Sequence, residues 1–324
     1  MEKQYDVVAL GELLIDFTDN GISSQGNTLF EANPGGAPCN VLALLNKLGH
    51  KTAFIGKVGE DLFGHQLKQV LEALQIDTTG LLMDKEVRTT LAFVKTLEGG
   101  DRDFSFYRNP GADMMLDETE INEELIQNAK VFHFGTLSMT HEKVRKATYK
   151  ALEIAKANHL LISFDPNLRE PLWDSLEEAK EQVAYGLQYC QILKISDNEI
   201  QWFTGKQDYT EGIRLLQETY HIPLILLSMG KEGSRAYYKD EIIEVAPFIQ
   251  ENTIETTGAG DTFLGGCLHY LLQNDIKSLT KEQLTEMLTF ANAAASIITT
   301  RKGALCVMPN VDEIHELIRK YKVK

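Results

Sequence analysis

Short apolar segments alternate with helical patterns along most of the chain, and this alternation constrains the fold more than any other feature. Between the segments, apolar residues recur at helical spacing, as Leu67, Val70, Leu71 and Leu74 do. The segments are rich in β-branched residues, as buried parallel strands are, and they lie at 5–10, 52–58, 131–134, 160–165, 192–196 and 223–229. The pattern predicts an α/β fold in which helices cover both faces of a mostly parallel sheet. Such sheets bind ligands at the carboxyl ends of their strands.

Two stretches do not follow this alternation. Residues 15–30 are polar and rich in Gly, Ser and Asn, and residues 89–107 alternate as a hairpin does, with a turn at 98–101. Together they predict a small β-rich subdomain, formed by about 13–32 and 88–110, within a single domain that spans 1–324. A few strands over a cleft would form a lid.

The charge balance argues against two classes of partner. Among 324 residues there are 32 Lys plus Arg and 47 Asp plus Glu, which give a formal net charge of −15. A nucleic-acid or anionic-membrane binder should have a basic surface, so we expect neither partner. The apolar runs are too short to span a bilayer, and the N-terminal residues lack a signal-peptide pattern, so we place the protein in the cytoplasm. The four scattered cysteines indicate free thiols.

A glycine-rich segment at 255–266 indicates a phosphate site. Its residues Gly258, Ala259 and Gly260 precede an apolar helix, whose first backbone N–H groups and dipole suit an anion. Asp261 at the helix start could be a simple cap. A carboxylate beside a phosphate cradle is better suited to be a base that takes a proton from a hydroxyl attacking the phosphoryl group.

A second glycine segment, 33–43, leads into another helix. Gly35 and Gly36 let the backbone approach a ligand closely, and the Asn40 amide can donate to and accept from sugar hydroxyls. The alternative is a plain turn before a helix. Neither segment is a Walker A loop. The first strand is not followed by GxGxxG, which argues against a nucleotide-binding oxidoreductase.

These motifs together resemble the ribokinase-like (pfkB) carbohydrate kinase family, and within it the fructokinases. The resemblance covers nearly the whole chain and includes GELLIDF at 11–17, GKVGED at 56–61, FYRNPGAD at 106–113 and DPNLR at 165–169. It implies a three-layer α/β sandwich with a β-rich lid, and ATP-dependent phosphorylation of the primary hydroxyl of D-fructose to fructose 6-phosphate. The alternatives are a 2-keto-3-deoxygluconate kinase or another sugar kinase of the family, and a non-catalytic sugar-binding regulator.

The resemblance also implies roles for individual residues. Asp261 would be the catalytic base, and Gly258, Ala259 and Gly260 would form the anion hole for the transferred phosphoryl group. The implied sugar-binding positions, of which Phe106 and Arg108 belong to the lid, are Asp16, Gly35, Gly36, Asn40, Phe106, Arg108, Asn167 and Arg169. The implied nucleotide-binding positions are Ser196, Ser228, Gly230, Gly233 and Asn292.

Three departures from the family pattern concern cations. Glu255 stands where the family usually has an Asp near a monovalent cation, and Val307 stands where some members have Ser, so we expect weak or altered K⁺ activation. The other positions implied near that cation are Thr257, Arg301 and Gly303. In the family's Asn-x-x-Glu motif, Ser196 replaces the Asn and Glu199 is kept. Mg-ATP use is therefore expected, with Glu199 acting on Mg²⁺ indirectly.

The expected partners are small molecules, a sugar and ATP. Lid strands with exposed edges and aromatic residues such as Phe93 could also pair between two subunits, which favours a homodimer through the lid.

Overall fold

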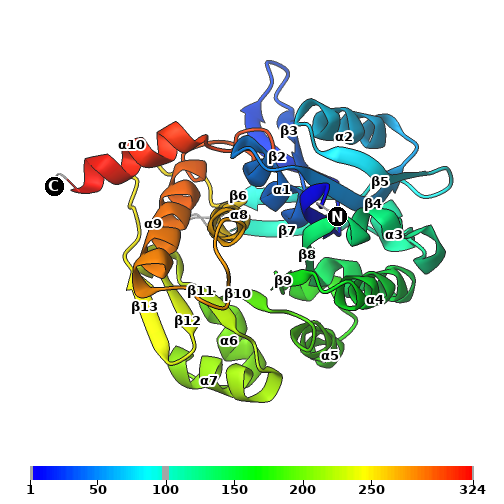
Figure 1. Cartoon of the computed structure of the whole chain (residues 1–324). Coiled ribbons are helices and arrows are strands. Elements are labelled where there is room, and N and C mark those ends of the chain that lie inside the picture. Colours follow the sequence, from blue (N-terminus) through cyan, green and yellow to red (C-terminus); the bar gives the residue numbers. More distant parts are fainter. Residues whose placement is uncertain (1–2, 97–101, 323–324) are drawn as a thin grey trace.

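A nine-stranded sheet forms the body of the protein in the computed structural model, which describes residues 3–96 and 102–322 (Figure 1). The strand order is β13-β12-β11-β10-β9-β8-β1-β4-β5, parallel from β11 to β5 and antiparallel at β12 and β13. The bounds are β1 Tyr5–Leu10, β4 Thr52–Gly59, β5 Asp77–Asp84, β8 Ala129–Gly135, β9 Leu161–Asp165, β10 Ile192–Ser196, β11 Leu224–Ser228, β12 Ser234–Tyr238 and β13 Glu241–Val245.

The six predicted strands are confirmed to within two residues at each end. The strands outside that prediction are β5, β12 and β13. Two of them, β5 and β13, form the edges of the sheet, and their sequences, DTTGLLMD and EIIEV, carry polar residues where a central strand would be apolar. The turn predicted at 98–101 lies outside the described residues.

Helices cover both faces of this sheet, as the alternation predicts. One face packs against α3 (Glu123–Gln127), α4 (Glu142–Ala157), α5 (Leu176–Leu187), α6 (Asp197–Thr204) and α7 (Tyr209–Tyr220). The other packs against α1 (Ala37–Lys47), α2 (Leu62–Ala73), α8 (Ala259–Leu271) and α9 (Lys281–Ile298), and α10 (Val311–Lys322) lies on α9. Within the described part of the chain, the helices are too short or too polar to cross a bilayer.

Small residues let α8 approach its neighbours closely. A β-carbon on Gly265 would lie 3.0 Å from Leu44 in α1, and one on Gly266 would lie 2.9 Å from the backbone of Ala291 in α9. Since α1 and α8 carry the two glycine segments at their amino ends, this packing brings segments from opposite ends of the sequence together.

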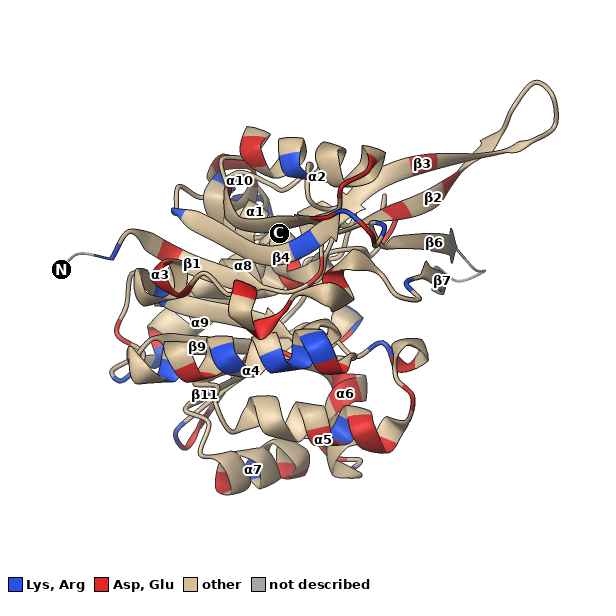
Figure 2. Ribbon diagram, turned by 90° about the vertical axis from the view of Figure 1, so that its right-hand side faces the viewer, with Lys and Arg blue, Asp and Glu red and all other residues tan. Residues whose placement is uncertain are grey.

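A second, four-stranded sheet adjoins the body, in the order β3-β2-β6-β7. Its strands are β2 (Leu14–Ile22), β3 (Thr28–Gly35), β6 (Leu91–Thr96) and β7 (Arg102–Tyr107), and β2 pairs with β6 in parallel while the other pairs are antiparallel. The polar stretch 15–30 thus forms most of a hairpin, which extends away from the body in Figure 2.

Candidate active site

A cavity of about 230 Å³ lies where the carboxyl ends of the central strands meet the first turns of α1 and α8. The predicted site residues that line it are Asp16, Gly36, Asn40, Phe106, Asn167, Arg169, Thr257, Gly258, Gly260 and Asp261. The residues that line it without having been predicted are Glu12, Leu14, Ala37, Leu137, Lys194 and Thr256. The structure therefore brings both glycine segments, the small sheet and the loop after β9 to one place.

The carboxylate of Asp261 lies in the first turn of α8 and is 9% exposed. Asn40 Nδ2 donates to its Oδ2 at 2.8 Å, which fixes the orientation of the carboxylate. Gly258 caps the helix with φ 73°, and a β-carbon on it would lie 2.5 Å from the side chain of Ala304. Glycine is therefore required here, both for the turn and for the close approach.

The first turn of α1 is held by a buried acid. Gly36 has φ 133°, and a β-carbon there would lie 2.3 Å from the Glu12 carbonyl oxygen. The Glu12 side chain accepts a hydrogen bond from the Ala37 N–H at 2.8 Å. Gly35 lies beside this turn, where a β-carbon would meet Asp16 Oδ2 at 2.4 Å. The glycine pair thus leaves room for the Glu12 main chain and for the Asp16 carboxyl group.

A buried ion pair lies next to the first turn of α8. Lys194 Nζ is 3.0 Å from Asp165 Oδ2. Burial disfavours the charge of Lys194, but the carboxylates of Asp165 and Glu199 outweigh burial and raise the pKa of Lys194. The lysine is therefore a positive charge on the floor of the cavity.

Glu199 holds the loop that carries two predicted sugar-binding residues. Its Oε1 accepts from the Leu168 N–H at 2.8 Å, between Asn167 and Arg169. Its Oε2 accepts from the N–H and Oγ of Ser196, at 2.8 and 2.7 Å, which closes the capping box of α6. Burial opposes the charge of Glu199, but Lys194 and these donors lower its pKa.

Arg108 does not line the cavity, although Phe106 does. It is 7% exposed. Its Nε lies 2.8 Å from Asp113 Oδ2, its NH1 donates to Thr140 Oγ1 at 2.8 Å, and its NH2 donates to the Leu137 carbonyl at 2.9 Å. These contacts join the end of β7 to the segments that carry Asp113, Leu137 and Thr140.

All five predicted nucleotide-binding residues lie outside this cavity. Ser196 caps α6 and Ser228 ends β11. Gly230 and Gly233 lie in the β11–β12 connection, and Asn292 lies in α9. Asn292 is buried, and its Oδ1 accepts from Ser234 Oγ at 2.8 Å. Its Nδ2 donates to the carbonyls of Val245 and Ala246, at 3.1 and 3.2 Å. The amide thus joins α9 to β12 and to the segment after β13.

The predicted cation residues lie beside the main cavity. Glu255, Thr257 and Gly303 line a space of about 10 Å³, close to the volume of one water molecule or bare ion. The Gly303 N–H donates to Glu255 Oε1 at 2.8 Å. Arg301 instead pairs with Glu313. Among the described residues, no cluster of three His, Cys, Asp or Glu side chains could hold a metal ion.

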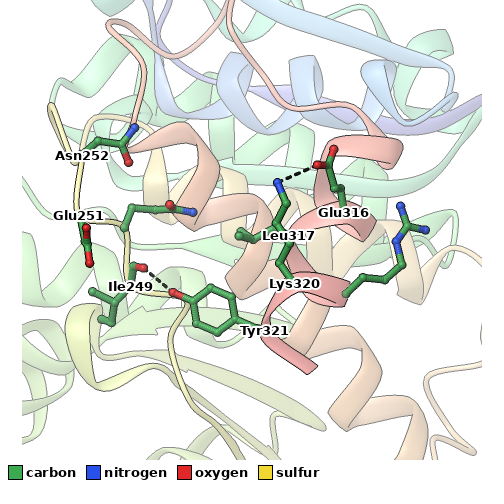
Figure 3. Close-up of a pocket in the computed structure, with 9 residues that line it drawn as sticks. Ile249, Glu251, Asn252, Glu316, Leu317, Lys320 and Tyr321 are labelled. Atoms are coloured by element: carbon green, nitrogen blue, oxygen red, sulfur yellow. Dashed lines mark hydrogen bonds and ion pairs between the residues drawn. The ribbon is translucent and has the colours of Figure 1, made fainter. Parts of the chain in front are cut away.

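A larger hollow, of about 750 Å³, lies elsewhere, between residues 249–252 and α10. Figure 3 shows Tyr321 directed at the Ile249 carbonyl, to which its hydroxyl donates, and Lys320 paired with Glu316. Ile249 and Tyr321 are 56% and 38% exposed. This open groove lacks the buried, converging polar groups that the smaller cavity has.

The comparison with known proteins decides the family. The pfkB family carbohydrate kinase model matches residues 4–310. The chain belongs to the pfkB carbohydrate kinase family. It is 43% identical to probable fructokinase-2 of Arabidopsis thaliana, over 94% of this chain and 92% of that protein. It is 40% identical to fructokinase-2 of Solanum lycopersicum, over 97% and 96%.

Solved structures of two fructokinases and a putative ribokinase II have the same fold. The fructokinase of Xylella fastidiosa with bound ATP aligns with a TM-score of 0.89 at 28% identity, over 98% of this chain and 99% of that one. The fructokinase of Vibrio cholerae O395 bound to fructose, ADP and calcium gives 0.87 at 29%, over 97% and 99%. A putative ribokinase II of E. coli with ATP and Mg²⁺ gives 0.86 at 26%, over 98% and 99%. The predicted ribokinase-like sandwich is confirmed.

Three buried charged residues that line the cavity or pair with its lining were not predicted as site residues, namely Glu12, Asp165 and Lys194. Glu12 and Asp165 lie within the motifs GELLIDF and DPNLR, so the motif itself was the available signal. Lys194 interrupts the apolar strand ILKIS. A lysine is rarely buried inside a strand unless it is paired, so this residue indicated a buried charge pair.

Proposed function

We propose that this protein is an ATP-dependent fructokinase, which transfers the terminal phosphoryl group of ATP to the primary hydroxyl of D-fructose and forms fructose 6-phosphate. The observation that carries the proposal is the placement of Asp261, which an Asn40 hydrogen bond orients in the first turn of α8 within a cavity. Relatives named fructokinase, similar over nearly the whole chain, support the sugar.

In this reaction Asp261 accepts the proton of the attacking hydroxyl. The first-turn amides of α8 at Gly260 and Asp261 stabilise negative charge on the transferring phosphoryl group, whereas the Ala259 N–H donates to the Thr256 carbonyl at 3.2 Å. The transition state is loose, so positioning of the two substrates supplies much of the acceleration. Asp16, Asn40 and the loop held by Glu199 position the sugar hydroxyls.

The proposed nucleotide is Mg-ATP, lying along the β11–β12 connection toward α9. Mg²⁺, when bound, would neutralise the phosphates of ATP. Glu199 would act on it indirectly, because both carboxylate oxygens of Glu199 accept hydrogen bonds from the protein. A monovalent cation such as K⁺ would lie near Glu255, Thr257 and Gly303, with a carbonyl from Arg301. Glu255→Asp should increase activation by K⁺ over Na⁺, and equal activation in both proteins would reject this site.

We further propose that the small sheet is a lid over the sugar. Its register places Asp16, Ala92 and Phe106 side by side across three strands, and Asp16 and Phe106 line the cavity. Closure over the sugar excludes water, which would otherwise accept the phosphoryl group.

The opposite face of the lid is the proposed dimer interface. Phe93 stacks on Phe17 at 4.9 Å and meets Phe30 and Tyr107 at 5.3 Å. Phe30 and Tyr107 remain 47% and 64% exposed, an aromatic surface that a second subunit would cover. Light scattering should report a dimer for the native protein and a monomer for Tyr107→Asp. A native protein that is monomeric at micromolar concentration would reject the interface.

The neutral sugar is favoured over the keto acid by the placement of Arg108. An arginine over the sugar could pair with a 2-keto-3-deoxygluconate carboxylate, but Arg108 does not line the cavity, and its guanidinium already contacts Asp113, Thr140 and the Leu137 carbonyl. ATP and free sugars occur in the cytoplasm, where we place the enzyme. Its cysteines that the structure describes are free, which fits that compartment.

The test is release of ADP from Mg-ATP with fructose, 2-keto-3-deoxygluconate, ribose, glucose or no sugar. We expect turnover to be far higher with fructose, and Asp261→Asn to lower kcat by about 10²–10⁴-fold. Asp275→Asn, at an exposed aspartate, is the matched control and should keep full activity. If no sugar stimulates ADP release from folded protein, the non-catalytic regulator becomes the better hypothesis.

A further inference from the structure

Lys194 is a charged residue in an apolar setting. It lies in β10, and its strand neighbours Leu193 and Ile195 are fully buried in the core. Lys194 itself is 6% exposed, and it lines the cavity together with Gly258, Gly260 and Asp261. Burying an ammonium group is costly unless it is paired. A lysine at this position therefore requires a partner for its charge, and its presence calls for a functional or structural explanation.

Asp165 is the partner, but it does not use the whole ammonium group. Lys194 Nζ lies 3.0 Å from Oδ2 and 3.2 Å from Oδ1 of Asp165. Lysine has three N–H donors, so these two contacts occupy at most two of them. The pair holds Nζ in place and leaves a donor for a ligand in the cavity.

The position of Nζ identifies the ligand atoms. A β-carbon on Gly260 would lie 3.1 Å from Nζ, so the ammonium group is directly beside the first turn of α8. That turn is where the proposed kinase mechanism stabilises the phosphoryl group. An ammonium group and helix amides at the same place form a stronger anion site than either alone.

The charges in the cavity also indicate that Lys194 contacts a phosphate group. Its lining includes the carboxyl groups of Glu12, Asp16 and Asp261, and the positive charges of Lys194 and Arg169. ATP brings several negative charges, and Asp261 adds one beside the transferring group. Arg169 is partly exposed, whereas Lys194 is buried, where a charge is screened least.

We propose that Lys194 is a catalytic residue that donates a hydrogen bond to the phosphoryl group in transfer, with Asp165 as its positioning residue. The proposal rests on the proposed kinase function. Its alternative is a purely structural ion pair that joins β9 to β10.

The test compares two buried lysines. Lys194→Met with Asp165→Asn removes the ion pair without leaving a buried carboxylate unpaired. Lys57→Met is the matched control, because Lys57 is also 6% exposed, in β4, and pairs with Glu120 at 2.6 Å outside the cavity. For each variant, kcat for fructose phosphorylation, calorimetric binding of ATP and AMP, and the urea midpoint are measured.

We expect the Lys194 double variant to lose about 100-fold or more in kcat, as removal of one transition-state donor does. It should bind ATP more weakly while binding AMP as the native protein does. Lys57→Met should keep its kcat even where its urea midpoint falls. Lys194→Arg, which keeps the charge, should retain more activity than the double variant.

A double variant that folds and keeps kcat within threefold of the native value would overturn the proposal. So would a loss of AMP and ATP binding in equal measure, because that indicates a structural role. If the double variant does not fold, Lys194→Gln decides alone, because its amide can still donate a hydrogen bond but carries no charge, and native kcat and ATP affinity in it would reject the charged donor. Failure of the native protein to phosphorylate any sugar would instead reject the kinase function.

Discussion

Glu12→Gln separates the charge of a buried carboxyl group from its hydrogen bond. Glu12 is 4% exposed and accepts from the Ala37 N–H, a bond that a glutamine carbonyl can also accept. Burial, with a smaller effect of Asp113, raises the pKa of Glu12 from 4.5 to about 7, although the hydrogen bonds and Arg108 act against it. The native fold therefore favours the protonated acid.

The raised pKa of Glu12 makes the stability of the native protein depend on pH. The unfolded chain releases the Glu12 proton near pH 4.5, and the folded protein holds it up to about pH 7. Between these values the folded state binds more protons, so its stability falls as the pH rises. At about 1.36 kcal/mol per pKa unit, the native protein should lose about 3 kcal/mol relative to Glu12→Gln across this window.

Urea unfolding of both proteins at half-unit steps from pH 5 to 8 measures the difference directly. The exposed Glu118→Gln serves as the control and should track the native protein throughout. If the free energies of unfolding of Glu12→Gln and the native protein differ by the same amount at every pH, Glu12 ionises normally. A difference that grows in favour of the native protein would show that its carboxylate is stabilised, and either result refutes the reasoning.

Two further predictions concern packing. Arg108→Met should lower the free energy of unfolding in urea by about 3–5 kcal/mol, because it leaves the buried carboxyl group of Asp113 without its ion-pair partner. Adding Asp113→Asn should restore part of the loss. A raised fructose KM at unchanged stability would place Arg108 in the sugar site instead. Gly258→Ala should cost more than Gly205→Ala in thermal unfolding, because both have φ near 70° but only the first would meet Ala304; equal losses would show that the contact relaxes freely.

The fold and much of the site could be predicted because their signals are local. A buried parallel strand is a short apolar run, and β1 and β10 have the bounds predicted for them. The glycines at 36 and 258 are turn signals whose positive φ values the structure shows. Residues that followed such signals, among them Asp261 and Asn40, meet in one cavity.

The rest depends on contacts between distant segments, which a single sequence does not display. The motif at 106–113 could not show the contacts of the Arg108 guanidinium, because Thr140, which it contacts, lies 32 positions later. Lys194 belongs to none of the motifs, so the sequence did not place it in the site. It lies next to Gly260 only because the chain folds the first turn of α8 beside it.

The hydrogen bond between Asn40 and Asp261 joins residues 221 positions apart. During synthesis, the turn before Asn40 emerges from the ribosome early, and the proposed base Asp261 is made only after 260 of the 324 residues. A nascent or truncated chain that ends before α8 lacks both the proposed base and the proposed anion site. In the proposed mechanism, the order of the segments thus prevents phosphoryl transfer until nearly the whole protein has been made.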